Sequence, residues 1–277
     1  MSLGVLDPAV LNGLAHQLDP SILMEDLGFV PDEWQKRCLR SISDRILLLC
    51  ARQTGKSSTT AILSLLTGLY GAGDLVLLVS PSLRQSGELF RKVVGYYDAL
   101  GRPLGAVEDS ATTLALSNHS RIVSLPCNPA TIRGFSGPRL VVIDEAALCP
   151  DELFGALLPM LAVSRGRLVC LTTPMGRRGF FFEQWESGIG WDRIMITAHE
   201  CPRIAPDFLA EQRQLLGDRW FRQEYMCSFE EAIDQVFSAQ SVLAAFSSTK
   251  PPLFESTGIA LALDTTSNKV PLYGLKG

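Results

Sequence analysis

Residues 50–58 read CARQTGKSS, in which a glycine, a lysine and a serine stand in a row. This is the second half of the phosphate-binding pattern G-x-x-x-x-G-K-[ST], with Cys50 where the first glycine would stand. In that pattern Gly55 brings the backbone close to the phosphates, Lys56 reaches the β- and γ-phosphates, and Ser57 offers its hydroxyl to Mg²⁺. Taken alone, the half-motif also fits an ordinary turn between a strand and a helix.

The loop and two nearby positions supply further candidates for contacts with ATP. The predicted ATP-binding segment comprises Arg52, Gln53, Thr54, Gly55, Lys56, Ser57 and Ser58. Gln35, ahead of the first core strand, is a candidate for reading the adenine edge, and a plain surface glutamine is the alternative. Arg52 and Arg133 are both candidates for a cation that stabilises the transition state, and a surface arginine is the default for each.

A second chemical signal lies in LVVIDEAA at 140–147, where four apolar residues precede Asp144 and Glu145. This is the pattern of a Walker B strand, in which the Asp holds Mg²⁺ and an adjacent Glu polarises the attacking water. We expect these acids at a strand end that neighbours the phosphate loop. The segment LTTP at 171–174 ends a strand beside the acidic one, and its two threonines are candidates for sensing the γ-phosphate.

The elements that must position these residues alternate between strands and helices. We predict strands at 45–51, 74–81, 138–146, 167–174 and 192–200, and a hairpin at 113–127. Helices are predicted from Asp32 as N-cap, at 56–70, after Pro81, at 150–161, and at 206–229 with a break near Gly217. This order is typical of an α/β fold with a mostly parallel sheet, whose ligands bind at the carboxyl ends of the strands.

Composition limits the function classes. With 277 residues and 47% hydrophobic residues, the chain is long enough for a substantial core. Its formal net charge of -4 gives no overall basic field that would recruit nucleic acid. The seven cysteines are scattered and indicate reduced thiols, not a disulfide framework or a zinc site. No signal peptide or apolar run of membrane length is present, so we expect no membrane contact and a cytoplasmic location.

The order of the motifs resembles that of the large terminase subunits of tailed bacteriophages, the motors that drive DNA into procapsids. The resemblance extends from Trp34 to Phe237 and is carried by ARQTGKS, TIRGFSGPRLVVIDEAA, LTTP and FRQEY. Terminases often have a non-Gly residue at the first P-loop position and an Arg within the loop, as Cys50 and Arg52 are here. The resemblance implies a P-loop NTPase of the RecA/ASCE-like class.

The resemblance also implies catalytic roles. Lys56 and Ser57 would bind phosphate and Mg²⁺, Asp144 would complete the metal shell, and Glu145 would activate water. Arg133 would be the finger that a neighbouring subunit inserts into the ATP site.

Two other positions match the family less directly. Thr172 and Thr173 would form its coupling motif, and Gln35 matches its adenine-recognition position less specifically.

The predicted domains are an N-terminal helical arm (1–30), a P-loop ATPase domain with a C-terminal helical lid (31–246), a linker (247–258) and a truncated first strand of a nuclease-like domain (259–277). The family usually carries a nuclease of RNase H-like fold, and Asp264 resembles its first metal-binding acid. Because one carboxylate cannot hold a two-metal site, we expect no nuclease activity from this chain.

These inferences lead to one functional hypothesis and two rivals. The hypothesis is an ATP- and Mg²⁺-dependent motor subunit in the host cytoplasm. It would act as a homo-oligomeric ring that moves double-stranded DNA through sequence-independent backbone contacts, with a portal and a small terminase subunit as partners. Arg177 and Arg178, which precede aromatic residues, are basic candidates for the DNA contact. The rivals are a helicase-like ATPase and an inactive prophage remnant that binds nucleotide without turnover.

Overall fold

The computed structural model describes residues 8–230. The predicted linker, the nuclease-like strand and Asp264 lie outside the described residues, as does the end of the predicted ATPase domain. Within the described part, eight strands form one sheet in the order β3-β4-β5-β2-β6-β7-β1-β8. The strands are β1 (Arg45–Cys50), β2 (Leu75–Ser80), β3 (Ala106–Asp109), β4 (Thr113–Leu116), β5 (Arg121–Pro126), β6 (Leu140–Asp144), β7 (Arg167–Thr172) and β8 (Asp192–Ile196).

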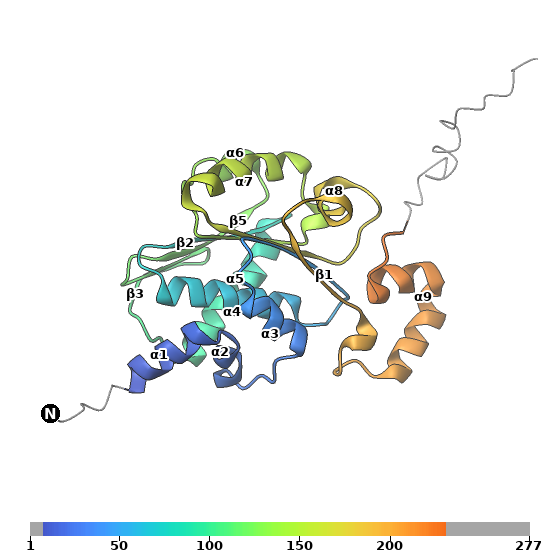
Figure 1. The fold of residues 1–277 in the computed structure, drawn as a ribbon, viewed down its shortest axis with the longest axis horizontal. Coiled ribbons are helices and arrows are strands. Elements are labelled where there is room, and N and C mark those ends of the chain that lie inside the picture. Colours follow the sequence, from blue (N-terminus) through green and yellow to red (C-terminus); the bar gives the residue numbers. More distant parts are fainter. Residues whose placement is uncertain (1–7, 231–277) are drawn as a thin grey trace, which may run out of the picture. The chain divides into compact units, whose positions relative to one another are not determined.

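Helices cover both faces of this sheet (Figure 1). On one face lie α1 (Pro8–Leu18), α2 (Ser21–Asp26), α3 (Glu33–Arg40), α4 (Lys56–Tyr70) and α5 (Leu83–Ala99). On the other lie α6 (Pro129–Ile132), α7 (Asp151–Ser164) and α8 (Gly179–Ser187), while α9 (Pro206–Met226) stands beyond the β1 side. Short 3₁₀ helices η1 (Ala146–Leu148) and η2 (Ala198–Glu200) follow β6 and β8. None of the described helices is long and apolar enough to cross a membrane.

The parallel strands are buried on both faces, as the continuous apolar runs predict. Successive side chains of a strand point to opposite faces, so the side chains of β1 pack in two hydrophobic cores, one on each face of the sheet. Leu48 packs with α2 to α5 in one core, and Leu47 packs with α7, α8 and α9 in the other. All strand pairs from β5 across to β8 are parallel, whereas β4 is antiparallel to β5 and β3 is antiparallel to β4. The predicted α/β class with a mostly parallel sheet is confirmed.

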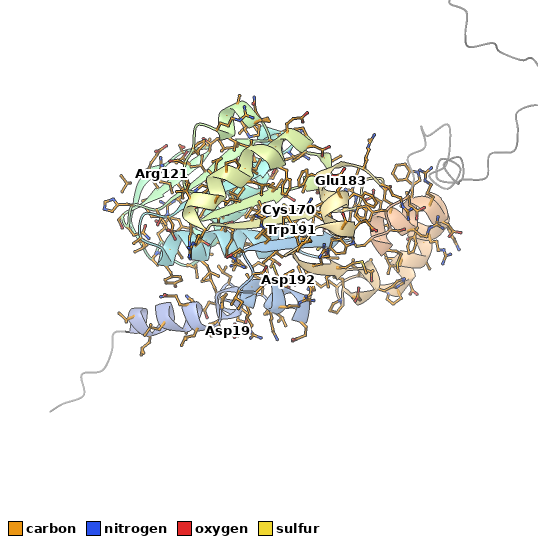
Figure 2. All side chains as sticks on the ribbon, turned by 45° about the horizontal axis from the view of Figure 1, so that its top comes forward. Asp19, Arg121, Cys170, Glu183, Trp191 and Asp192 are labelled. Atoms are coloured by element: carbon orange, nitrogen blue, oxygen red, sulfur yellow. The ribbon has the colours of Figure 1, made fainter. Side chains whose placement is uncertain are left out.

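The first helices pack on the core. Leu23 of α2 is fully buried, and His16 of α1 lies between the Tyr70 hydroxyl (2.6 Å) and the Asp26 carboxylate (2.7 Å). Asp19 accepts two bonds from the Arg40 guanidinium, at 2.9 and 2.6 Å. Figure 2 labels Asp19, which lies between α1 and α2. The segment predicted as an arm is therefore part of the packed face beside α4.

The sequence did not predict α6, the two 3₁₀ helices, β3 or α8. β3 is an exposed edge strand of four residues, too short to show an alternating pattern. α8 begins at Gly179 within the segment interpreted above as basic and aromatic, and its Phe180 and Phe181 are buried. The predicted break in the last helix is confirmed, because Gly217 has a non-helical backbone (φ 75°, ψ 160°) inside α9.

Candidate nucleotide-binding site

The phosphate loop joins β1 to α4 at the carboxyl edge of the sheet, as predicted. Gly55 is the N-cap of α4 and adopts φ 95°, a left-handed conformation that favours glycine. Gln53 also has positive φ, at 63°. The Thr54 hydroxyl is buried and donates to the Ala51 carbonyl at 2.9 Å, which closes the loop on itself. The first N–H groups of α4 have no partner within the helix, so the loop presents donors for an anion.

The two acids lie at the end of β6. Asp144 is 8% exposed, and its Oδ2 lies 3.5 Å from the Ser57 hydroxyl. Burial, and after it the adjacent Glu145 charge, raise the pKa of Asp144 to about 6, although Lys56 opposes both effects. Glu145 adopts φ 51°, uncommon for a residue other than glycine, and its N–H donates to Asp144 Oδ1 at 2.9 Å.

The expected neighbour relation of the acidic strand and the loop strand is corrected by the sheet order. β7 lies between β1 and β6, so the acids are two strands from the loop. In the register, Asp144 pairs with Leu171, and Leu49 pairs with Thr172. The threonines of LTTP therefore occupy the gap between the loop and the acids. The expectation that LTTP ends beside the acidic strand is confirmed.

Lys56 connects these groups. Its Nζ lies 3.1 Å from the Thr173 hydroxyl and 3.3 Å from Glu145 Oε1. Thr172 is fully buried, donates to the Thr173 carbonyl at 2.8 Å and accepts from the Ala147 N–H at 3.4 Å. One hydrogen-bonded chain thus runs from the phosphate loop through β7 to the segment after the acids.

Two cavities open beside the loop. The first, which we call the loop cavity, has a volume of about 310 Å³ and is lined by Arg52, Gln53, Gly55, Lys56, Ser57, Ser58 and Lys92. The second, which we call the apolar cavity, has about 400 Å³ and is lined by Met24, Gly28, Phe29, Val30, Asp32, Gln35, Gly55, Ser58, Pro202 and Arg203. Gly55 and Ser58 line both, so the two cavities adjoin at the start of α4.

Gln35 lies in the wall of the apolar cavity and is buried. Its Oε1 accepts from the Asp32 N–H at 2.9 Å, and its Nε2 donates to the Thr59 hydroxyl at 3.0 Å. One Nε2 proton and one Oε1 lone pair are left over for a ligand. Asp32 is the N-cap of α3, as predicted.

The two candidate arginines occupy different settings. Arg52 lines the loop cavity, but its guanidinium pairs with the Glu224 carboxylate of α9. The backbone N–H of Arg52 also donates to the backbone carbonyl of Glu224, at 3.1 Å. Arg133 caps the C-terminus of α6 and is exposed. Within residues 8–230 it lines neither cavity and has no hydrogen bond or ion pair from its side chain. The structure therefore does not bring Arg133 into the site of its own chain.

In the basic segment that leads into α8, Phe180 and Phe181 face the core, so they offer no exposed surface for stacking on bases. The DNA contact predicted for Arg177 and Arg178 stays a prediction. Arg177 donates to the Phe229 carbonyl at 3.2 Å.

Sequence reasoning missed three residues at the site. Lys92 comes from α5, Arg203 from the segment before α9, and Glu224 from α9. Lys92 and Arg203 stand in no local motif, and Glu224 lies in FRQEY, to which no site role was assigned. Only the fold reveals that the three residues reach the loop.

The oxygen atoms at the end of β6 fit a magnesium ion. Mg²⁺ is typically held by one or two protein oxygens together with water and substrate phosphates. The Ser57 hydroxyl and the Asp144 carboxylate, 3.5 Å apart beside the loop cavity, supply such a pair. Within the described residues no group of three or more His, Cys, Asp or Glu side chains could form a metal site made of protein alone.

The fold and this site define a P-loop NTPase domain. Over 79% of its length the chain is 25% identical to the large terminase subunit of Thermus virus P23-45. It spans about half the length of the curated relatives it matches. Its relatives are thus phage large terminase subunits, as the motif order indicated. No model of a known protein family matches the chain.

Solved structures agree on the fold. The ATPase domain of the Thermus phage P74-26 large terminase superposes with a TM-score of 0.67 at 20% identity, covering 75% of this chain and 97% of that one. The large terminase of another thermophilic bacteriophage, in complex with ADP, superposes with a TM-score of 0.61 at 10% identity, covering 72% of this chain and 54% of that one. The chain therefore has the fold of a large terminase ATPase domain.

Proposed function

We propose that this chain is the ATP-hydrolysing motor part of a phage terminase, which moves double-stranded DNA into a procapsid. The observation that carries the proposal is the convergence on Lys56. Its ammonium group contacts Glu145 and Thr173, while Ser57 lies beside Asp144. Relatives that are large terminase subunits, and the thermophilic phage terminase structure that holds ADP, support the assignment.

Several residues at and beside the loop cavity have a defined task in this proposal. Lys56 and the first N–H groups of α4 bind the phosphates of ATP, and Ser57 and Asp144 hold Mg²⁺. When bound, Mg²⁺ neutralises charge on the phosphate oxygens. Lys56 turns from Glu145 to the phosphates, and the freed carboxylate orients the attacking water and takes up its proton. Thr173 accepts a hydrogen bond from the same ammonium group, so the movement of Lys56 alters this bond and is passed on through the hydrogen bond between Thr172 and Thr173.

The site needs a further cation, which a neighbouring subunit supplies. Arg52 is paired with Glu224, whereas the Arg133 side chain is exposed and lines neither cavity of its own chain. We assign Arg133 to the site of the next subunit in a homo-oligomeric ring. Such a heterologous contact joins two different surfaces, so rings or filaments follow from it.

The partners and the location are part of the same proposal. DNA is contacted through its phosphates, without regard to sequence, and the portal and the small terminase subunit complete the machine in the host cytoplasm. The role of Gln35 in adenine recognition belongs to this proposal, because the residue lines the apolar cavity and keeps one free amide proton.

The test is ATP hydrolysis per subunit as a function of protein concentration, with and without double-stranded DNA. We expect the rate to rise with concentration and to vanish in Glu145→Ala and in Arg133→Ala. Arg121→Ala is the control, because this exposed arginine lies at the amino end of β5, away from the loop edge (Figure 2).

Mixing the two inactive variants separates the roles. A subunit with Glu145 intact next to one with Arg133 intact rebuilds a complete site, so the mixture should regain part of the activity. Full activity of Arg133→Ala alone would refute the trans assignment. ATP binding without turnover by the unmutated chain, even when concentrated with DNA, would identify a nucleotide-binding module instead of a motor.

A further inference from the structure

Arg203 joins three segments that are far apart in the sequence. Its Nη1 donates to Asp32 Oδ1 at 2.9 Å, and its Nη2 donates to Asp32 Oδ2 at 2.7 Å. The same Nη2 donates to the Thr54 carbonyl at 2.8 Å. One guanidinium therefore links the N-terminus of α3, the phosphate loop and the residues that lead into α9.

The bond to Thr54 fixes the orientation of one peptide group. The described peptides are trans and planar, so the carbonyl of Thr54 and the N–H of Gly55 point in opposite directions. With its oxygen held by Arg203, this peptide directs the Gly55 N–H away from the apolar cavity that Arg203 lines. Without that partner, the carbonyl would be free to rotate and the N–H would lose its direction.

The loop fits closely against this support. A Cβ atom on Gly55 would lie 3.0 Å from Gln35 Nε2 and 3.6 Å from Arg203 Nη2. A side chain at residue 55 would therefore meet both Gln35 and Arg203, and the left-handed φ of this residue also favours glycine. Gln35 and Arg203 form a wall behind the loop.

The charge of Arg203 is already matched. The Asp32 side chain is 12% exposed, and both of its carboxylate oxygens accept from the guanidinium in the bidentate geometry that suits this pair. Arg203 is consequently not a spare cation for phosphate, unlike Lys92, which lines the loop cavity. Its role must be exerted through the backbone that it holds.

We propose that Arg203 is a positioning residue for nucleotide binding, which holds the Thr54–Gly55 peptide so that the loop presents its N–H groups to phosphate, and that Asp32 holds Arg203 for this task. The inference rests on the proposed function only in requiring that the loop bind nucleotide phosphates. It predicts that loss of Arg203 weakens phosphate binding without unfolding the protein.

The experiment uses titration calorimetry of the full chain with Mg²⁺ and two probes, ADP and inorganic tripolyphosphate. Arg203→Ala should weaken both probes by about 10- to 100-fold, the range for a hydrogen bond to a charged group. Arg203→Lys should recover little of the lost affinity for either probe, because a single ammonium group cannot reproduce both the bidentate pair with Asp32 and the hydrogen bond to Thr54. The inorganic probe has no base, so it reports the loop alone.

Arg40→Ala is the matched control. Its guanidinium forks Asp19 with similar exposure and also joins α3 to a neighbouring segment, but it does not touch the loop. Arg40→Ala should lower the melting temperature about as much as Arg203→Ala and leave both dissociation constants within about twofold. If Arg203→Ala binds both probes like the unmutated chain, the inference is wrong. A loss for ADP alone would also overturn it, since Arg203 would then act only as a wall of the apolar cavity.

A double-mutant cycle covers the case in which Arg203→Ala folds poorly. Asp32→Asn keeps an N-cap residue on α3 but removes half of the fork, and it should weaken both probes less than Arg203→Ala does. The double variant should bind no more weakly than Arg203→Ala alone; additive losses would contradict the shared task. If the unmutated chain binds neither probe, the proposed function itself fails, which is a separate result.

Discussion

Lys56 is the central residue of the site, because its one ammonium group contacts both Glu145 and Thr173. A lysine paired with a carboxylate is held in place before any phosphate arrives, and its side chain is only 12% exposed. The same pairing occupies the carboxylate that must later take a proton. Phosphate binding and the release of Glu145 are therefore linked through one side chain.

Lys92 gives a prediction at the residue scale. It reaches the loop cavity from α5, so its exposed ammonium group adds positive potential where phosphates bind. We expect Lys92→Ala to weaken ADP binding by about two- to fivefold at low salt, as for an exposed charge, and by less at high salt. Calorimetric titration at two salt concentrations measures this.

The neighbouring Arg91 is the control for Lys92. It is exposed on the same helix, pairs with Glu88 and does not line the cavity. Arg91→Ala should leave the dissociation constant unchanged. Equal effects of the two substitutions would show that Lys92 acts only through the general charge of the surface.

At the residue scale the sequence predicted what stands in motifs. The loop residues and the two acids came from short patterns, because chemistry requires those residue types at fixed spacing. Arg203 and Glu224 escaped because their contacts span 149 and 172 residues along the chain. The trans role of Arg133 stays a prediction, since it concerns a neighbour.

The N-terminal helices give a prediction at the element scale. Arg40 donates to Asp19 and so holds the pKa of that carboxyl well below its usual range. A depressed pKa contributes stability that is present above the unfolded pKa, near 3.9, and is lost as the pH falls toward the folded value. We expect Asp19→Asn to cost about 1 kcal/mol at pH 7 and progressively less below about pH 4.

Denaturant unfolding of the unmutated chain and of Asp19→Asn, from pH 7 to below about pH 4, tests whether the stability depends on the charge of Asp19. Asp218→Asn, in the fully surface-exposed pair with Arg213, should cost only a few tenths of a kcal/mol at either pH. A penalty for Asp19→Asn that does not change with pH would assign the loss to packing instead of charge.

Gly217 gives a second prediction at this scale. Its φ of 75° with ψ of 160° suits glycine, and a Cβ atom there would meet no other atom within 4 Å. The cost of Gly217→Ala is therefore backbone strain alone, about 1–3 kcal/mol. Hydrogen exchange should show faster exchange of the amides in α9.

Gly95 in α5 is the matched control, because it too has open space around a Cβ atom but lies inside a regular helix. Gly95→Ala should stabilise the protein by about 0.5–1 kcal/mol. If Gly217→Ala were as stabilising as Gly95→Ala, the break in α9 would not depend on glycine.

Strongly periodic elements were predictable and weakly patterned ones were not. The strands β1, β2, β6 and β7 read as apolar runs because both of their faces are buried. The exposed edge strand β3 carries no such run. The position of β7 between β1 and β6 could not be deduced, because chain order does not determine strand order in a sheet.

For the whole molecule, nucleotide binding should raise stability. A ligand at 100 times its dissociation constant contributes about 2.7 kcal/mol, which for a domain of this size is a rise of about 5–11 °C in melting temperature. We expect this rise with ADP and Mg²⁺ in a thermal shift measurement. The Lys56→Ala variant should show almost none, and an unshifted melting temperature for the unmutated chain would mean that the loop binds no nucleotide.

The described α9 is attached to the phosphate loop at two points. Arg203 holds the Thr54 carbonyl just before α9 begins, and Glu224 holds Arg52 near its end. Gly217, where the helix departs from helical geometry, lies between these attachments. The loop and α9 thus form a closed frame with one pivot. We therefore expect a change in the separation of Arg52 and Thr54 to alter the bend of α9 at Gly217. The bend angle of α9 at Gly217 would then report the conformation of the phosphate loop.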